Sequence, residues 1–208
     1  MFDLLKRFQG RASAGPERWV VVDVETSGFD PTKDGLISIG GVAMRSDGHV
    51  LPGDSLEIIY RQSTASSREN ILVHGIGVQA QQGGADPEQA TRAFLDFVGV
   101  SPILAFHAPF DRGFLARAVK VFVNQPFDNP WLDLAELAPA VDPEAKLKSL
   151  DEWLGRYAID VSVRHSAAAD AFATALLAAR LLPKARKQGV QDFSALQKLA
   201  RQAKWLNA

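Results

Sequence analysis

The sequence WVVVDVET at residues 19–26 has the pattern of a buried β-strand that ends in acidic side chains. Its β-branched and aromatic residues favour a strand with apolar neighbours on both faces. Because side chains alternate along a strand, Asp23 and Glu25 project from the same face, about 7 Å apart. Two carboxylates so placed raise each other's pKa unless a positive charge lies between them. The alternative is a strand that simply runs out into solvent at Asp23.

Further strands and helices follow this stretch along the chain. Residues 36–44 and 55–60 are strand candidates, and the turn-like SDG at 46–48 favours antiparallel pairing between them. After a Ser/Thr-rich loop, the chain alternates between helical periodicity and short apolar runs. Helices are predicted near 90–98, 109–122, 147–157, 167–182 and 190–205, with a short strand at 103–106 and a short segment around 131–134. A three-stranded meander followed by alternating helices and strands predicts a mixed α/β sheet flanked by helices.

Length and composition predict one domain at 18–182, with an N-terminal extension at 1–17 and a helical C-terminal extension at 183–208. The chain has no cysteine, which excludes thiolate metal sites and is typical of a cytoplasmic protein. No apolar run is long enough to span a membrane, and Lys6 and Arg7 follow the first apolar residues, the reverse of a signal peptide. With a net charge of −1, a nucleic-acid partner would have to be held locally.

Asp111 is a third candidate acid, directly after Phe110 and two residues after Pro109. Proline is favoured in the first turn of a helix, and an acidic residue there suits the positive end of the helix dipole. The position therefore fits an ordinary helix start as well as a functional carboxylate.

The segment HSAAAD at 165–170 opens another predicted helix. Ser166 is a suitable N-cap, which puts His165 just before the cap and Asp170 at the fourth helical position. These two positions pack together in the hydrophobic-staple geometry, so an imidazole and a carboxylate are expected to be neighbours. A surface contact between His165 and Asp170 is the alternative.

Together these motifs resemble the DnaQ-like (DEDDh) family of 3′→5′ exonucleases, whose signature is four acids and one histidine. Asp-x-Glu-Thr followed by Gly is present at 23–28, Phe-Asp at 110–111, and His-x-Ala-x-x-Asp at 165–170. A weaker match is VHGI at 73–76, with Glu69 five residues before the histidine. The resemblance covers residues 18–182 with the motifs in the family's order. It looks most like the proofreading, epsilon-type branch.

This resemblance implies a ribonuclease H-like fold, with a mixed five-stranded sheet flanked by helices. It also implies hydrolysis of DNA from the 3′ end to nucleoside 5′-monophosphates. Asp23, Glu25, Asp111 and Asp170 would hold two divalent metal ions, Mg²⁺ or Mn²⁺, and His165 would be the general base. Hard oxygen ligands agree with such ions, and two cations about 4 Å apart can stabilise both the attacking and the leaving oxygen.

Substrate contacts are predicted in the turn after Glu25. The backbone N–H groups of Thr26 and Gly28 can approach the terminal sugar, and Phe29 either stacks on a base or packs into the core of an ordinary turn. Glu69 and His74 align with residues that contact the terminal nucleotide in the family.

One position departs from the family pattern. The family has His-Asn where this chain has Phe106 and His107, so either His107 takes over the positioning role of the asparagine or the local geometry differs.

Basic residues near the second motif and in the C-terminal extension either contact phosphates or form solvated helix faces. They are Arg112, Arg117, Lys120, Lys184, Arg186, Lys187, Lys198, Arg201 and Lys204, together with Arg164 beside His165.

The predicted partner is a single-stranded or frayed DNA 3′ end, with a DNA polymerase as a further candidate and no membrane. Two alternatives stay open. One is the same chemistry on RNA, as in oligoribonuclease and ribonuclease T, because the catalytic residues act on the phosphodiester and not on the 2′-OH. The other is an inactive polymerase-associated module, which five intact site residues disfavour.

Overall fold

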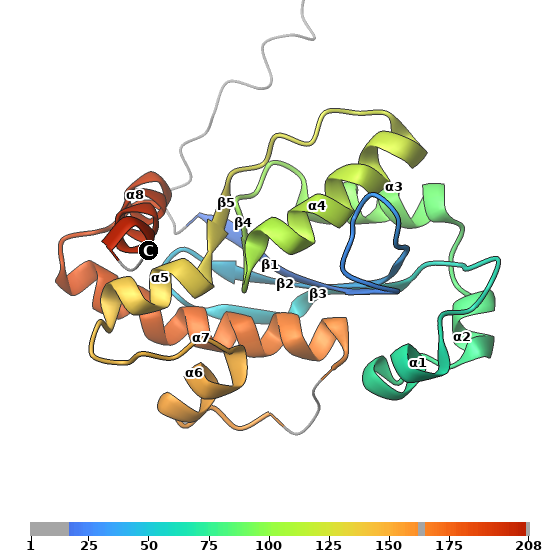
Figure 1. The fold of residues 1–208 in the computed structure, drawn as a ribbon. Coiled ribbons are helices and arrows are strands. Elements are labelled where there is room, and N and C mark those ends of the chain that lie inside the picture. The colour runs from blue at the N-terminus through green and yellow to red at the C-terminus, as the bar shows by residue number, and fades with distance from the viewer. Residues whose placement is uncertain (1–16, 162–164, 207–208) are drawn as a thin grey trace, which may run out of the picture.

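The computed structural model describes residues 17–161 and 165–206, and within this part five strands form one mixed sheet in the order β3-β2-β1-β4-β5 (Figure 1). The strands β1 (Arg18–Thr26), β2 (Leu36–Arg45) and β3 (Val50–Ile59) form an antiparallel meander. The short strands β4 (Ile103–Ala105) and β5 (Trp131–Asp133) extend the sheet in parallel on the other side of β1. The predicted mixed five-stranded sheet is confirmed, with β1 at its centre.

Helices cover both faces of the sheet. In Figure 1, α7 (Ala167–Lys187) lies along one face, and α3 (Pro87–Val98) and α4 (Ala108–Ala118) lie on the other. The chain continues from α4 into a π-helical segment, η1 (Val119–Val123). The remaining helices are α1 (Arg68–His74), α2 (Val78–Gln82), α5 (Leu134–Val141), α6 (Leu150–Arg156) and α8 (Phe193–Leu206). No helix in these residues is long and apolar enough to cross a membrane.

The side chains of β1 alternate between two separate apolar cores. Val20, Val22 and Val24 belong to the core under α3 and α4. Trp19 and Val21 belong to the core that α5, α6, α7 and α8 cover. Asp23 and Glu25 are in phase with Trp19 and Val21, so the alternation directs both acids to the side of α7.

A close approach between β2 and α7 brings these acids to the start of the helix. Gly40 pairs with Asp23 across the antiparallel ladder. A Cβ atom on Gly40 would lie only 2.0 Å from the carbonyl carbon of Ala167 and 2.2 Å from the amide nitrogen of Ala168. The absence of a side chain at residue 40 therefore allows the first turn of α7 to rest directly on the sheet beside Asp23.

The structure differs from the sequence expectations in several places, among them α5, which forms where no helix was predicted. β3 begins at Val50, earlier than predicted, and α7 continues through Pro183 to Lys187. The predicted loop after β3 contains the helices α1 and α2. α1 has no buried residue and α2 buries only Gln81, so neither helix needs the periodic apolar pattern by which a helix is predicted from sequence. Local capping defines α1 instead, with Ser67 accepting from the amide of Asn70 and Gly75 in the left-handed conformation. Residues 1–16 of the expected N-terminal extension lie outside the described residues, as does Arg164.

Candidate active site

Three of the predicted acids meet at the end of β1. One carboxylate oxygen from each of Asp23, Glu25 and Asp170 lies within 4.8 Å of the others. Glu25 and Asp170 are buried, and Asp23 is partly exposed. Carboxylate oxygens at this spacing suit a hard divalent cation, whose ligands lie about 2.0–2.6 Å from the ion. Without a counter-charge, three converging carboxylates would repel one another strongly.

The start of α7 places Asp170 in this group. Ser166 is the N-cap residue, as predicted, although its side chain makes no capping hydrogen bond. The amide of Asp170 donates to the carbonyl of Ser166 at 2.9 Å, and the amide of His165 donates to Oδ2 of Asp170 at 3.3 Å. The predicted pair is therefore in contact through the backbone N–H of His165. His165 itself is exposed and has a φ of 62°, an uncommon left-handed conformation for a residue other than glycine.

Asp111 approaches the same region from the opposite face of the sheet. It lies in the first turn of α4, is only 3% exposed, and accepts a hydrogen bond from the amide of Val24 on β1. Burial raises the pKa of Asp111 well above its ordinary value, and the charges of Asp133 and Glu25 raise it further. Its ionisation at neutral pH would therefore require a nearby positive charge. Asp111 lies outside the close group of three.

His74 is the last residue of α1, and its ring contacts Glu25 of β1. Nδ1 of His74 lies against Oε2 of Glu25, although the contact lacks hydrogen-bond geometry. Burial lowers the pKa of His74, and the charge of His165 lowers it further. The contact of His74 with Glu25 and the hydrogen bond from the amide of His165 to Asp170 place both residues beside the group of acids.

Glu69 has a different environment from His74. Its carboxylate accepts from its own amide and from the hydroxyl of Ser67, which lowers its pKa at the start of α1. The neighbouring Asn70 reaches further, because its Nδ2 donates to the carbonyl of Thr26 at 2.7 Å. Asn70 thereby attaches α1 to the turn after β1. It was missed because a lone amide in an unpredicted helix gives no sequence signal.

The turn after Glu25 is tightly constrained. The hydroxyl of Thr26 donates to the carbonyl of Gly28 at 2.7 Å, and a Cβ on Gly28 would meet Oδ2 of Asp34 at 2.3 Å. Phe29 at the tip is 90% exposed, with its ring 6.4 Å from that of Phe110. The alternative that Phe29 packs into the core is therefore wrong.

Asp133, which the sequence did not single out, joins β5 to the start of α4. Its Oδ1 accepts from the amide of His107 at 3.0 Å and from that of Ala135 at 2.9 Å, and the amide of Ala108 also donates to the carboxylate. Burial raises the pKa of Asp133. His107 is exposed and caps α4 with a φ of 66°. The sequence signal for Asp133 was an acidic residue between a short apolar strand and the helix that follows it, a position typical of an N-cap.

Several of the basic residues have structural partners. Arg117 donates to the carbonyls of Pro31 at 2.8 Å and Asp34 at 3.0 Å. Lys184 pairs with Asp142 at 2.9 Å, and Arg186 donates to the carbonyl of Asp47 at 2.9 Å. The sequence predicted either phosphate contacts or solvent exposure for these three residues, and the structure shows that each binds a group within the protein.

Comparison with known proteins identifies the family. The sequence profile of the RNase_T family, described as exonuclease, matches residues 20–178 and so includes all five predicted catalytic positions. The chain belongs to this exonuclease family.

Curated relatives of this exonuclease domain are polymerase-associated by name. The chain is 32% identical over 204 residues to the DNA polymerase III subunit epsilon-like protein of Rhodobacter capsulatus, and the match covers 94% of this chain and 28% of the relative. It is 30% identical over 176 residues to the PolC-type DNA polymerase III of Bacillus subtilis, covering 84% of this chain and 12% of the relative. The chain thus spans little more than a quarter of the length of the first relative and much less of the second.

Solved structures share the fold. E. coli exonuclease I in complex with a dT13 oligonucleotide superimposes with a TM-score of 0.72 at 19% identity, covering 83% of this chain and 42% of that one. The ribonuclease H-like expectation for the exonuclease domain is confirmed by this match at the level of fold.

Proposed function

We propose that this exonuclease domain removes nucleoside 5′-monophosphates one at a time from the 3′ end of single-stranded or frayed DNA. The observation that carries the proposal is the meeting of Asp23, Glu25 and Asp170 within 4.8 Å in a member of an exonuclease family. DNA is the proposed substrate because the relatives are named as DNA polymerase III components. A DNA polymerase is by the same argument the proposed partner.

The acids are proposed to hold two divalent cations, Mg²⁺ or Mn²⁺, with Asp23 shared between them. Glu25 and Asp170 would complete one ligand set, and Asp111 would contribute to the other. An all-oxygen ligand set from a chain without cysteine supports these ions over softer metals. When bound, two such cations supply electrostatic stabilisation of the oxygens that attack and leave the phosphorus.

His165 is proposed as the general base that accepts a proton from the attacking water at a ring nitrogen. Its support is positional: it precedes the cap of α7, its amide is bonded to Asp170, and its side chain is exposed at the rim of the acid group. A neutral imidazole is suited to this task near neutral pH. The left-handed backbone of His165 also supports a functional role, because such strain accumulates at active sites.

Substrate contacts are proposed for Thr26, Gly28, Phe29, Glu69, His74 and His107, the positions expected from the sequence. Of these, Phe29 has the clearest support, since an exposed aromatic ring at the rim can stack on a base. His74 lies against Glu25 and so borders the position that a scissile phosphate would occupy.

A single assay tests the proposal. A 5′-labelled single-stranded DNA oligonucleotide should shorten in one-nucleotide steps with Mg²⁺ or Mn²⁺, and excess EDTA should stop the reaction. Asp170→Asn should lower the rate by orders of magnitude, whereas Asp96→Asn, an exposed acid on α3, serves as the matched control. Undiminished cleavage in EDTA, or early release of the 5′ label as a mononucleotide, would contradict the proposal. A matched RNA oligonucleotide decides between DNA and RNA.

A further inference from the structure

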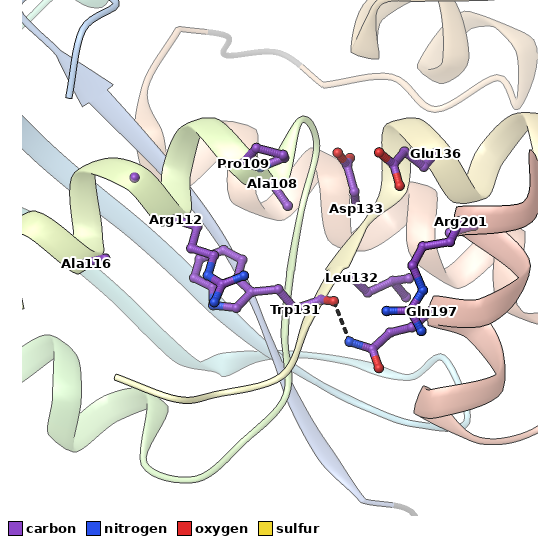
Figure 2. Close-up of a pocket in the computed structure, with 12 residues that line it drawn as sticks. Ala108, Pro109, Arg112, Ala116, Trp131, Leu132, Asp133, Glu136, Gln197 and Arg201 are labelled. Atoms are coloured by element: carbon purple, nitrogen blue, oxygen red, sulfur yellow. Dashed lines mark hydrogen bonds between the residues drawn. The ribbon is translucent and has the colours of Figure 1, made fainter. Parts of the chain in front are cut away.

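A cleft of about 460 Å³ lies between α4, β5, α5 and α8, and its lining does not include Asp23, Glu25 or Asp170. Figure 2 shows Arg112 on the α4 side and Gln197 and Arg201 on the α8 side, with Trp131 of β5 between the two helices. Its volume falls within the range of about 300–1,000 Å³ that is usual for ligand sites.

The α8 wall of this cleft is a feature of this chain's C-terminal extension. The exonuclease profile ends at residue 178, before α8 begins at Phe193. Leu196 and Ala200 are buried in the core, and Nε2 of Gln197 donates to the carbonyl of Trp131 at 2.8 Å (Figure 2). These contacts fix α8 against β5, so that Arg201 projects from a rigid support.

The lining combines the groups that recognise a nucleotide. Arg112 and Arg201 are exposed guanidinium groups on opposite walls, and guanidinium groups bind phosphate through paired N–H donors. Trp131 offers an indole on which a base can stack. The indole N–H of Trp131 is itself buried and donates to no group in the described part of the chain.

Two acids at one end of the cleft give it a direction. Asp133 and Glu136 lie together near the starts of α4 and α5 in Figure 2. The lining includes Ala108 and Pro109, which lie in the first turn of α4 together with Asp111, so this end of the cleft borders the candidate active site. Carboxylates repel a phosphate but accept hydrogen bonds from base amino groups. A phosphate is therefore favoured at the arginine end, away from Asp133 and Glu136.

We propose that this cleft binds a nucleotide of the substrate strand on the 5′ side of the nucleotide that is removed. The inference rests on the proposed function and adds a second contact region to it. β5 is two strands from β1, which at the usual strand spacing places β5, one wall of the cleft, about 10 Å from β1. A strand whose 3′ end lies at the acids can therefore reach Arg112, Trp131 and Arg201 with its upstream nucleotides.

The test compares two substrates that differ only in whether an upstream strand is present. One is a 5′-labelled single-stranded DNA oligonucleotide, and the other is p-nitrophenyl thymidine 5′-monophosphate, in which nitrophenolate replaces the upstream strand as the leaving group. The variants are Arg201→Gln and Arg112→Gln. Arg92→Gln, an exposed arginine paired with Glu88 on α3, is the matched control.

In the two cleft variants, the ratio of kcat/KM on the oligonucleotide to kcat/KM on the ester should fall about tenfold, the scale of one charged hydrogen bond. The loss should appear in KM, because the contact holds ground state and transition state alike. The slope of log KM against log salt should decrease by about one for each arginine. Arg92→Gln should show none of these changes.

Equal losses on both substrates would overturn the inference, because they would mean that the arginines act on the catalytic site or on the fold. Unchanged ratios in both cleft variants, with an active parent protein, would overturn this inference alone. A parent protein that hydrolyses neither substrate would overturn the proposed function, and this inference with it.

Discussion

Replacing Gly40 by alanine should separate Asp170 from the other acids without changing any of them. The new Cβ would lie 2.0 Å from the carbonyl carbon of Ala167 and 2.1 Å from its oxygen. Non-bonded carbon atoms are normally about 3.5–4.0 Å apart, so the first turn of α7 must move away from β2 by about 1.5 Å. These contacts are with backbone atoms, which cannot rotate away as a side chain can.

The expected effects follow from that displacement. Overpacking of this kind costs about 1–3 kcal/mol of the free energy of unfolding. For a chain of this length such a loss lowers Tm by roughly 2–12 °C. Misplacement of a catalytic group by about 1 Å can cost on the order of 10²-fold in rate, and Asp170 moves with α7. Gly40→Ala should therefore fold, bind Mn²⁺ more weakly and cleave DNA about 10²-fold more slowly.

Gly41→Ala is the matched control, because its Cβ would point to the opposite face of the same strand. The nearest atom there is Cε1 of the Phe97 ring at 2.8 Å, and a ring can shift. Both variants should lose stability in thermal unfolding, but only Gly40→Ala should lose Mn²⁺ affinity and cleavage rate. A folded Gly40→Ala protein that cleaves DNA at the parent rate would refute the claim that the close approach of α7 builds the site.

Three further outcomes are expected. His165→Ala should reduce the rate of DNA cleavage about 10²–10⁴-fold, whereas His49→Ala, an exposed histidine in the turn before β3, should not; equal rates in both would place the base elsewhere. Burial opposes the ionisation of Asp142, but hydrogen bonds from Lys184, Tyr157 and Arg156 outweigh this effect and lower the pKa of Asp142 to about 2. Asp142→Asn should therefore lower the free energy of unfolding by roughly 1–2 kcal/mol, a figure that allows for solvent screening of the exposed cations. Because the pKa of Asp142 is depressed, this loss of stability should be full above about pH 4 and should shrink toward pH 2. A difference in Tm between the parent protein and Asp142→Asn that does not change with pH in that window would contradict this expectation. A circular single-stranded DNA should resist degradation while a linear strand with a free 3′-OH is consumed, and equal loss of both would indicate endonuclease action.

The local pattern of the chain determined much of this protein. Alternation along β1 was enough to place Asp23 and Glu25 on one face, because side-chain direction in a strand depends only on sequence parity. Capping rules were enough to place Ser166 at the start of α7 and Asp170 one turn inside it. The order of the motifs was enough to indicate the exonuclease family, which the profile match confirms.

The tertiary structure decided which groups meet, because distances between residues far apart in sequence depend on pairing register and packing. The Gly40-Gly41 pair carried a signal for close backbone approach, but only the ladder shows that Gly40 faces Asp23 and α7 while Gly41 faces Phe97. Asn70 and Asp133 reach the site only in the folded chain, since each forms a hydrogen bond with a residue more than twenty positions away in the sequence. The cleft beside α8 likewise exists only because this helix packs against β5. Periodicity predicted the helix, but it carries no information on where in the fold the helix packs.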